Sequence, residues 1–139
     1  MSRVELSLWI DRSPPDVFAY MTDLERIREW QPATQSVHVE SDTRYTQVLR
    51  LMGRTIESRI EVTEREPPRR FAIRTSGGPV EFAVAHELEE EQGGTRLRVE
   101  GEGEAKGVFR LGGGAAVKAA EAELRKSFER LKAVLESSG

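Results

Sequence analysis

The sequence predicts an α+β protein with about seven antiparallel strands and one long C-terminal helix that packs on their sheet. Residues 4–10 alternate apolar and polar side chains with a period of two, and residues 36–105 contain further segments with the same alternation. Residues 115–137 change to a period of 3.6, which is typical of a helix. The 139 residues fit a single domain, 1–139.

The first strand leads directly into a helix start. Its apolar face consists of Val4, Leu6, Leu8 and Ile10. Ser13 is a helix-capping residue, Pro14 suits the first helical position, and Asp16 lies where a capping box places an acid. These signals predict a short helix over residues 14–21.

A second short helix is predicted directly after the first. Asp23 can cap it, and the helix is expected to run from Leu24 to about Trp30. Pro32 follows, and a proline disfavours helical backbone in the residue before it. Two short helices therefore separate the first strand from the remaining strands.

Six strands follow with short connections, which favours an antiparallel meander. Their expected inner faces are Val37 and Val39; Tyr45, Gln47, Leu49 and Leu51; Ile56, Ser58, Ile60 and Val62; Phe71, Ile73 and Thr75; Val80, Phe82, Val84, His86 and Leu88; and Thr95, Leu97 and Val99. Tight turns are predicted at Gly53-Arg54, at residues 77–79 and at Gly93-Gly94.

The C-terminal helix is predicted to bury one apolar stripe. The stripe consists of Val117, Ala120, Leu124, Phe128, Leu131 and Leu135. The charged residues predicted to lie away from it are Lys118, Glu123, Arg125, Lys126, Arg130 and Lys132. The sheet is the only large apolar surface available to this stripe, so the helix is expected to pack on the sheet.

Composition excludes several classes of function. The chain has no cysteine, which excludes disulfides and thiolate chemistry. It has only two histidines, which excludes a histidine-rich metal site. We therefore expect no metal and no cofactor. A net charge of −3 with interleaved acids and bases argues against nucleic-acid binding. No apolar run is long enough to span a membrane and no signal-peptide pattern is present, which favours a cytoplasmic location.

Four local stretches, residues 11–18, 22–32, 66–71 and 93–97, occur in this order between the first strand and the final helix. Their order and spacing resemble the helix-grip fold of the START and birch-pollen-allergen superfamily, and in particular its bacterial polyketide cyclase/dehydrase and lipid-transport family. The resemblance spans nearly the whole chain. It implies a hydrophobic ligand as partner, because this family contains binding proteins as well as cyclases, and it does not decide between them.

The resemblance implies a curved seven-stranded antiparallel sheet wrapped around the long C-terminal helix. Such a sheet cannot fill all the space between itself and the helix, so a cavity is expected. The small residues Ser58, Thr75, Ala116, Ala119 and Ala120 are expected to face inward and enlarge it. Such a mostly apolar site typically measures about 300 to 1,000 Å³. The residues expected to bind the ligand are Trp30, Tyr45, Gln47, Leu49, Ser58, Ile60, Phe82, Val84, His86, Phe109, Val117, Ala120 and Leu124.

His86 is the foremost polar candidate, because it shares a strand face with apolar residues. It can hydrogen-bond a ligand or act as an acid or base, or it can be a structural histidine satisfied by a neighbour. Trp30 can line the cavity mouth, which the resembled family builds from this helix pair, or anchor the short helices in the core. Tyr45 and Gln47 can orient a ligand or meet solvent at a strand end. Phe109 lies in a segment that the resemblance implies as a gate.

Three functional hypotheses follow. The first is binding, with transport or sequestration, of a hydrophobic small molecule or lipid in the cavity. The alternative is a polyketide cyclase/dehydratase-type enzyme, whose proton-transferring residue would be His86. The third is a partner-binding or chaperone-assisting role. An exposed Trp9 on the outer face of the first strand would suit such a role or a homodimer contact.

Overall fold

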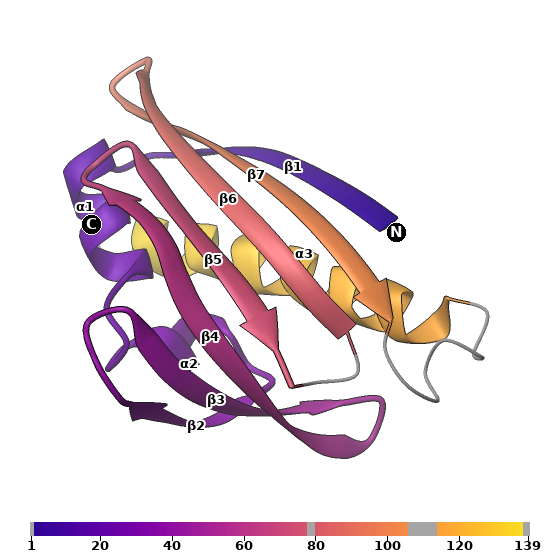
Figure 1. Cartoon of the computed structure of the whole chain (residues 1–139). Coiled ribbons are helices and arrows are strands. Elements are labelled where there is room, and N and C mark those ends of the chain that lie inside the picture. The colour runs from indigo at the N-terminus through magenta and orange to yellow at the C-terminus, as the bar shows by residue number, and fades with distance from the viewer. Residues whose placement is uncertain (1, 78–79, 106–113, 138–139) are drawn as a thin grey trace.

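The computed structural model describes residues 2–77, 80–105 and 114–137. Its elements are β1 (Ser2–Ile10), α1 (Pro14–Met21), α2 (Ile27–Trp30), β2 (Thr34–Val39), β3 (Arg44–Leu51), β4 (Arg54–Glu66), β5 (Arg70–Ser76), β6 (Val80–Glu91), β7 (Gly94–Ala105) and α3 (Ala115–Ser137). The strands form one seven-stranded antiparallel sheet in the order β1-β7-β6-β5-β4-β3-β2. Helix α3 lies across one face of the sheet (Figure 1), so the predicted fold class is confirmed.

The strand pairing follows a meander, with β1 closing on β7 rather than on β2. Register shifts interrupt the ladder between Thr34 and Ser36 and between Val62 and Glu64. An extra residue on one strand bends that strand and increases its twist. These irregularities lie in β2 and β4.

Two hairpin turns lie one residue earlier than predicted. Met52 and Gly53 have φ angles of 53° and 74°, and Gln92 and Gly93 have φ angles of 49° and 78°. Two consecutive positive φ values define the tight turn that best matches strand twist. Gly94 is therefore the first residue of β7 rather than part of the turn.

Gly94 is expected to tolerate no side chain. A Cβ atom there would lie 2.5 Å from the carbonyl oxygen of Ile10 and 2.7 Å from the Trp9 ring. Backbone cannot withdraw as a flexible side chain can, so Gly94→Ala is expected to lower the free energy of unfolding by about 1 to 3 kcal/mol in urea denaturation. The matched control is Gly93→Asn, since Gly93 has open space around it and asparagine accepts positive φ. Equal stability of both variants would contradict this account.

The first short helix forms as predicted and the second is shorter. Ser13 caps α1 by accepting a hydrogen bond from the Asp16 backbone N–H at 3.4 Å. Helix α2 begins at Ile27 rather than at Leu24. The Asp23 carboxylate accepts the Glu25 N–H at 3.0 Å, so this aspartate stabilises a local turn instead of a helix start.

Two separate apolar clusters hold α3 on the sheet. The larger one comprises Ile10, Val17, Phe18, Met21, Ile27, Trp30, Phe71, Val84, Leu88, Leu97, Val99, Phe128, Leu131 and Leu135. The smaller one comprises Val80, Ala116 and Val117, with Phe82 packed against it. The large cluster contacts the C-terminal half of α3 and the small cluster its first turn. The middle of the helix lies between them.

Trp9 is half-buried rather than freely exposed. Its indole Nε1 donates to the carbonyl oxygen of Glu91 at 2.8 Å, and the Lys132 ammonium lies 5.6 Å from its ring centroid. The polar group and one face of this ring are therefore engaged within the chain, and a homodimer contact at Trp9 stays a prediction. In the described ranges, no helix is both long enough and apolar enough to cross a membrane.

Candidate ligand pocket

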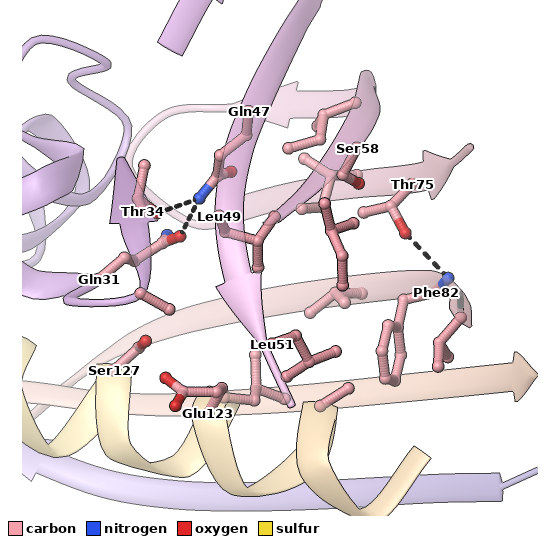
Figure 2. Close-up of a pocket in the computed structure, with 18 of the residues that line it drawn as sticks. Gln31, Thr34, Gln47, Leu49, Leu51, Ser58, Thr75, Phe82, Glu123 and Ser127 are labelled. Atoms are coloured by element: carbon pink, nitrogen blue, oxygen red, sulfur yellow. Dashed lines mark hydrogen bonds between the residues drawn. The ribbon is translucent and has the colours of Figure 1, made fainter. Parts of the chain in front are cut away.

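A pocket of about 180 Å³ lies between the middle of α3 and strands β3 to β6 (Figure 2). Its walls are formed by Trp30, Gln31, Ala33, Thr34, Tyr45, Gln47, Leu49, Leu51, Ile56, Ser58, Ile60, Ile73, Thr75, Val80, Phe82, Val84, His86, Ala120, Glu123, Leu124, Ser127 and Phe128. Most of these side chains are apolar, and the two apolar clusters flank the pocket along the helix. The volume is smaller than the expected 300 to 1,000 Å³.

The structure brings most of the predicted site residues together. Trp30, Tyr45, Gln47, Leu49, Ser58, Ile60, Phe82, Val84, His86, Ala120 and Leu124 all line the pocket. Val117 does not line it, because its side chain packs with Ala116 and Val80 in the small cluster. Phe109 and most of the expected gate segment lie outside the described residues.

Two polar residues of α3 that were not predicted from the sequence to face the pocket also line it. The prediction that Glu123 lies away from the sheet is wrong, and Ser127, which is 7% exposed, lies one turn further along the helix. Figure 2 shows both projecting from α3 toward the strands. The lining positions of α3 follow helical spacing and are 120, 123, 124, 127 and 128. The helix face that lines the pocket is therefore wider than the predicted apolar stripe, and it includes the polar positions 123 and 127 beside that stripe.

Glycine in β7 explains where the Phe82 ring lies. Gly103 pairs with Phe82 across the β6–β7 ladder, and a Cβ atom at Gly103 would lie 2.8 Å from the Phe82 Cδ1 atom. The missing side chain lets the ring lie against the neighbouring strand, as aromatic residues often cover glycines in sheets. Phe82 thereby lines the pocket and also packs on the small cluster. In this position its ring occupies space that would otherwise enlarge the pocket.

One polar corner of the pocket is already satisfied internally. The Gln47 amide donates to Gln31 Oε1 at 2.7 Å and to Thr34 Oγ1 at 2.5 Å. At the opposite side the Thr75 hydroxyl accepts the Phe82 backbone N–H at 3.0 Å, beyond the last paired residues of β5 and β6. These groups hold strands in place, and their hydrogen bonds do not require a ligand.

His86 is a neutral ring held in an aromatic cluster. Its Nδ1 donates to the Phe71 carbonyl oxygen at 2.7 Å, which leaves Nε2 of the neutral ring as a hydrogen-bond acceptor. Its ring centroid lies 5.6 Å from those of both Phe71 and Phe128. Burial lowers the pKa of His86 to about 4, although the bond to Phe71 opposes this shift.

Tyr45 is buried in the wall formed by β3. Burial raises the pKa of its phenol to about 12, with the Arg65 charge opposing the shift. The hydroxyl therefore stays protonated at neutral pH. It adds a group to the pocket that can both donate and accept a hydrogen bond.

The part of the chain that the structure describes contains no group of three or more acidic or histidine side chains placed to hold a metal ion. Two buried polar atoms of the described residues have no hydrogen-bond partner, and both belong to residues that line the pocket: Nε1 of Trp30 and Oε2 of Glu123. Buried polar atoms in folded proteins are normally paired. Both exceptions therefore occur in residues of the same pocket wall.

A seven-stranded antiparallel sheet crossed by a long C-terminal helix, with a pocket between them and two short helices after the first strand, defines the helix-grip class of proteins. Residues 1–136 match the family described as polyketide cyclase / dehydrase and lipid transport. The chain belongs to this family. No curated protein matches the sequence.

Solved structures with the same fold have low sequence identity to this chain. A START superfamily protein from Mycobacterium smegmatis is 14% identical with a TM-score of 0.82, and 99% of each chain is covered. The protein TTHA0849 from Thermus thermophilus is 17% identical with a TM-score of 0.79 and the same coverage. A conserved protein from Geobacillus kaustophilus is 18% identical with a TM-score of 0.79, covering 99% of this chain and 97% of that one. These similarities show the fold.

Proposed function

We propose that this protein binds a small hydrophobic molecule in the pocket between the sheet and α3. The observation on which the proposal rests is a mainly apolar pocket between two packed clusters, at the place where the helix and the sheet do not meet. Membership of a family that includes lipid transport supports the same conclusion. Burial of apolar ligand surface, worth about 25 cal/mol per Å², would supply the driving force.

The pocket volume limits the ligand to one of modest size. An apolar cavity of about 150 Å³ lined by Leu, Ile and Phe binds benzene in another protein. The present pocket, at about 180 Å³, suits a compound of one or two rings rather than a long lipid chain. Transport or sequestration of such a compound is the role that we propose.

Two alanines of α3 offer a matched test of this proposal. Ala120 lines the pocket, whereas Ala122 is exposed two residues away on the same helix. Ala120→Phe places a ring in the cavity and is expected to weaken binding of p-xylene about tenfold or more, measured by isothermal titration calorimetry. Ala122→Phe is expected to bind like the wild type. Equal affinities of the two variants, or no binding of p-xylene and naphthalene by the wild type, would refute the proposal.

One observation favours a second candidate, a cyclase/dehydratase-type enzyme. Glu123 and His86 are two titratable groups lining one pocket, as proton transfer requires. His86 is however a weak base at neutral pH, because its pKa is about 4 and its Nδ1 is engaged by Phe71. Binding is therefore the better-supported function. Turnover of a polyketide-like substrate that His86→Ala abolishes while binding persists would favour the enzyme.

A further inference from the structure

Two residues that line the pocket each have a buried polar atom without a hydrogen-bond partner among the described residues, and the chemistry of the two atoms is complementary. Trp30 is 3% exposed, and its ring packs on Phe128 with centroids 5.3 Å apart, so the indole is held in place while Nε1 stays unpaired. On the facing helix, Oε2 of Glu123 is also buried and unpaired. The first atom can only donate a hydrogen bond, and a carboxylate oxygen can only accept one.

We infer that the pocket selects a small uncharged ring compound with a hydroxyl group, which donates to Glu123 and accepts from Trp30. A hydroxyl both donates and accepts, whereas an ammonium group only donates and would leave the indole unpaired. A ligand carboxylate would be repelled by the Glu123 charge. This inference rests on the proposed function, because it names the ligand class of the same pocket.

The remaining walls agree with this ligand class. The aromatic rings of Trp30, Phe128 and Phe82 and the aliphatic side chains of β3, β4 and β6 line the same pocket as Glu123. An apolar ring can occupy this space while its hydroxyl meets the two unpaired atoms. Bound water also donates and accepts, so the experiment must separate a ligand hydroxyl from water.

The test compares p-cresol with p-xylene, which replaces the hydroxyl by a methyl group of similar size. Titration calorimetry measures both affinities for the wild type, Glu123→Met and Trp30→Phe. We expect Glu123→Met to weaken p-cresol binding about tenfold or more, because hydrogen bonds to charged groups are the stronger ones. Trp30→Phe keeps an aromatic ring and is expected to weaken it several-fold. Affinity for p-xylene should stay equal or rise in both variants.

Glu129→Met is the matched control, because Glu129 is exposed on the same helix and is not part of the pocket wall. It should bind both probes like the wild type. Circular dichroism confirms that each variant folds. Since Glu123 lies on α3 and Trp30 on α2, loss of folding in one variant leaves the other as a test.

Four results would overturn the inference. If both variants bind p-cresol as tightly as the wild type, bound water and not the ligand hydroxyl is the hydrogen-bond partner of the two atoms. If both variants bind p-cresol and p-xylene equally more weakly than the wild type, the two side chains have a packing role only. Binding of p-xylene by the wild type would then still support the proposed function. If the wild type binds benzylammonium more tightly than p-cresol, and Glu123→Met loses this preference, the pocket selects a cationic ligand instead. If neither p-cresol nor p-xylene binds the wild type, the proposed function fails together with the inference.

Discussion

Replacing Phe128 with alanine is expected to lower the free energy of unfolding by about 3 to 5 kcal/mol, the range observed for large aromatic residues in cores. Phe128 is 2% exposed and lies in the large apolar cluster on α3. Its ring contacts the rings of Trp30 and His86, with centroids 5.3 and 5.6 Å away. Truncation removes these contacts and leaves a void that rigid sheet and helix backbones cannot fill. Urea denaturation monitored by circular dichroism measures the loss.

Phe128→Leu is the control for this prediction. Leucine keeps most of the apolar volume, so its cost is expected to be clearly smaller. Since Phe128 also forms part of the pocket wall, the alanine variant should enlarge the pocket and still bind p-xylene. A loss below about 1 kcal/mol for Phe128→Ala would contradict the view that this side chain joins the short helices, the sheet and α3 into one core.

The order of the helices and strands could be predicted from the sequence because local patterns determine it. The change from a period of two to a period of 3.6 at Ala115 marks the start of α3, and Ser13 with Pro14 marks the start of α1. Short connections between strands leave a meander as the simplest arrangement. Each of these signals involves neighbouring residues only, so no knowledge of distant contacts is required.

The errors arose where two local signals compete. Asp23 can cap a helix or stabilise a turn, and here its carboxylate accepts the Glu25 N–H and the helix starts only at Ile27. In both hairpins, a residue other than glycine takes the first left-handed position, Met52 in one and Gln92 in the other. Glycine is the residue that sequence rules favour at such positions. Both turns were therefore predicted to begin at the glycine, one residue too late.

The candidate site could be predicted only in part. Alternation along β3, β4 and β6 placed Tyr45, Ser58 and His86 on the inner face, where the structure has them. Glu123 was missed because a charged residue beside an apolar stripe is normally solvated. Pocket volume depends on how Phe82 packs over Gly103, which is a contact between strands that periodicity does not reveal.

His86 combines features of both interpretations offered from the sequence. Its Nδ1 is satisfied by the Phe71 carbonyl, as in a structural histidine, while its ring lines the pocket, as a ligand-contacting residue would. At neutral pH the buried ring is uncharged, because its pKa is about 4. A role in donating a proton to a bound molecule is therefore disfavoured near pH 7. Accepting a hydrogen bond at Nε2 remains compatible with the proposed binding function.

The same burial should make folding stability depend on pH. In the unfolded chain His86 has an ordinary pKa of about 6.5 and takes up a proton as the pH falls, whereas the folded protein resists protonation until about pH 4. The stabilising contribution is thus fully present above about pH 6.5 and is lost as the pH falls to about 4. The two pKa values correspond to a loss of about 3 kcal/mol, measured by urea denaturation across this range.

The His86→Asn variant is expected to be less stable at pH 7, since it leaves a small cavity, but its stability should fall less between pH 6.5 and 4 than that of the wild type. Every other ionisable group is the same in both proteins, so the difference between the two curves isolates the buried imidazole. His38 is the other histidine of the chain and is exposed on β2, so His38→Asn should follow the wild-type curve. If the free energy of unfolding falls equally with pH in the wild type and in His86→Asn, acid protonates this ring without opening the core. His86 could then not be treated as a neutral part of the pocket wall.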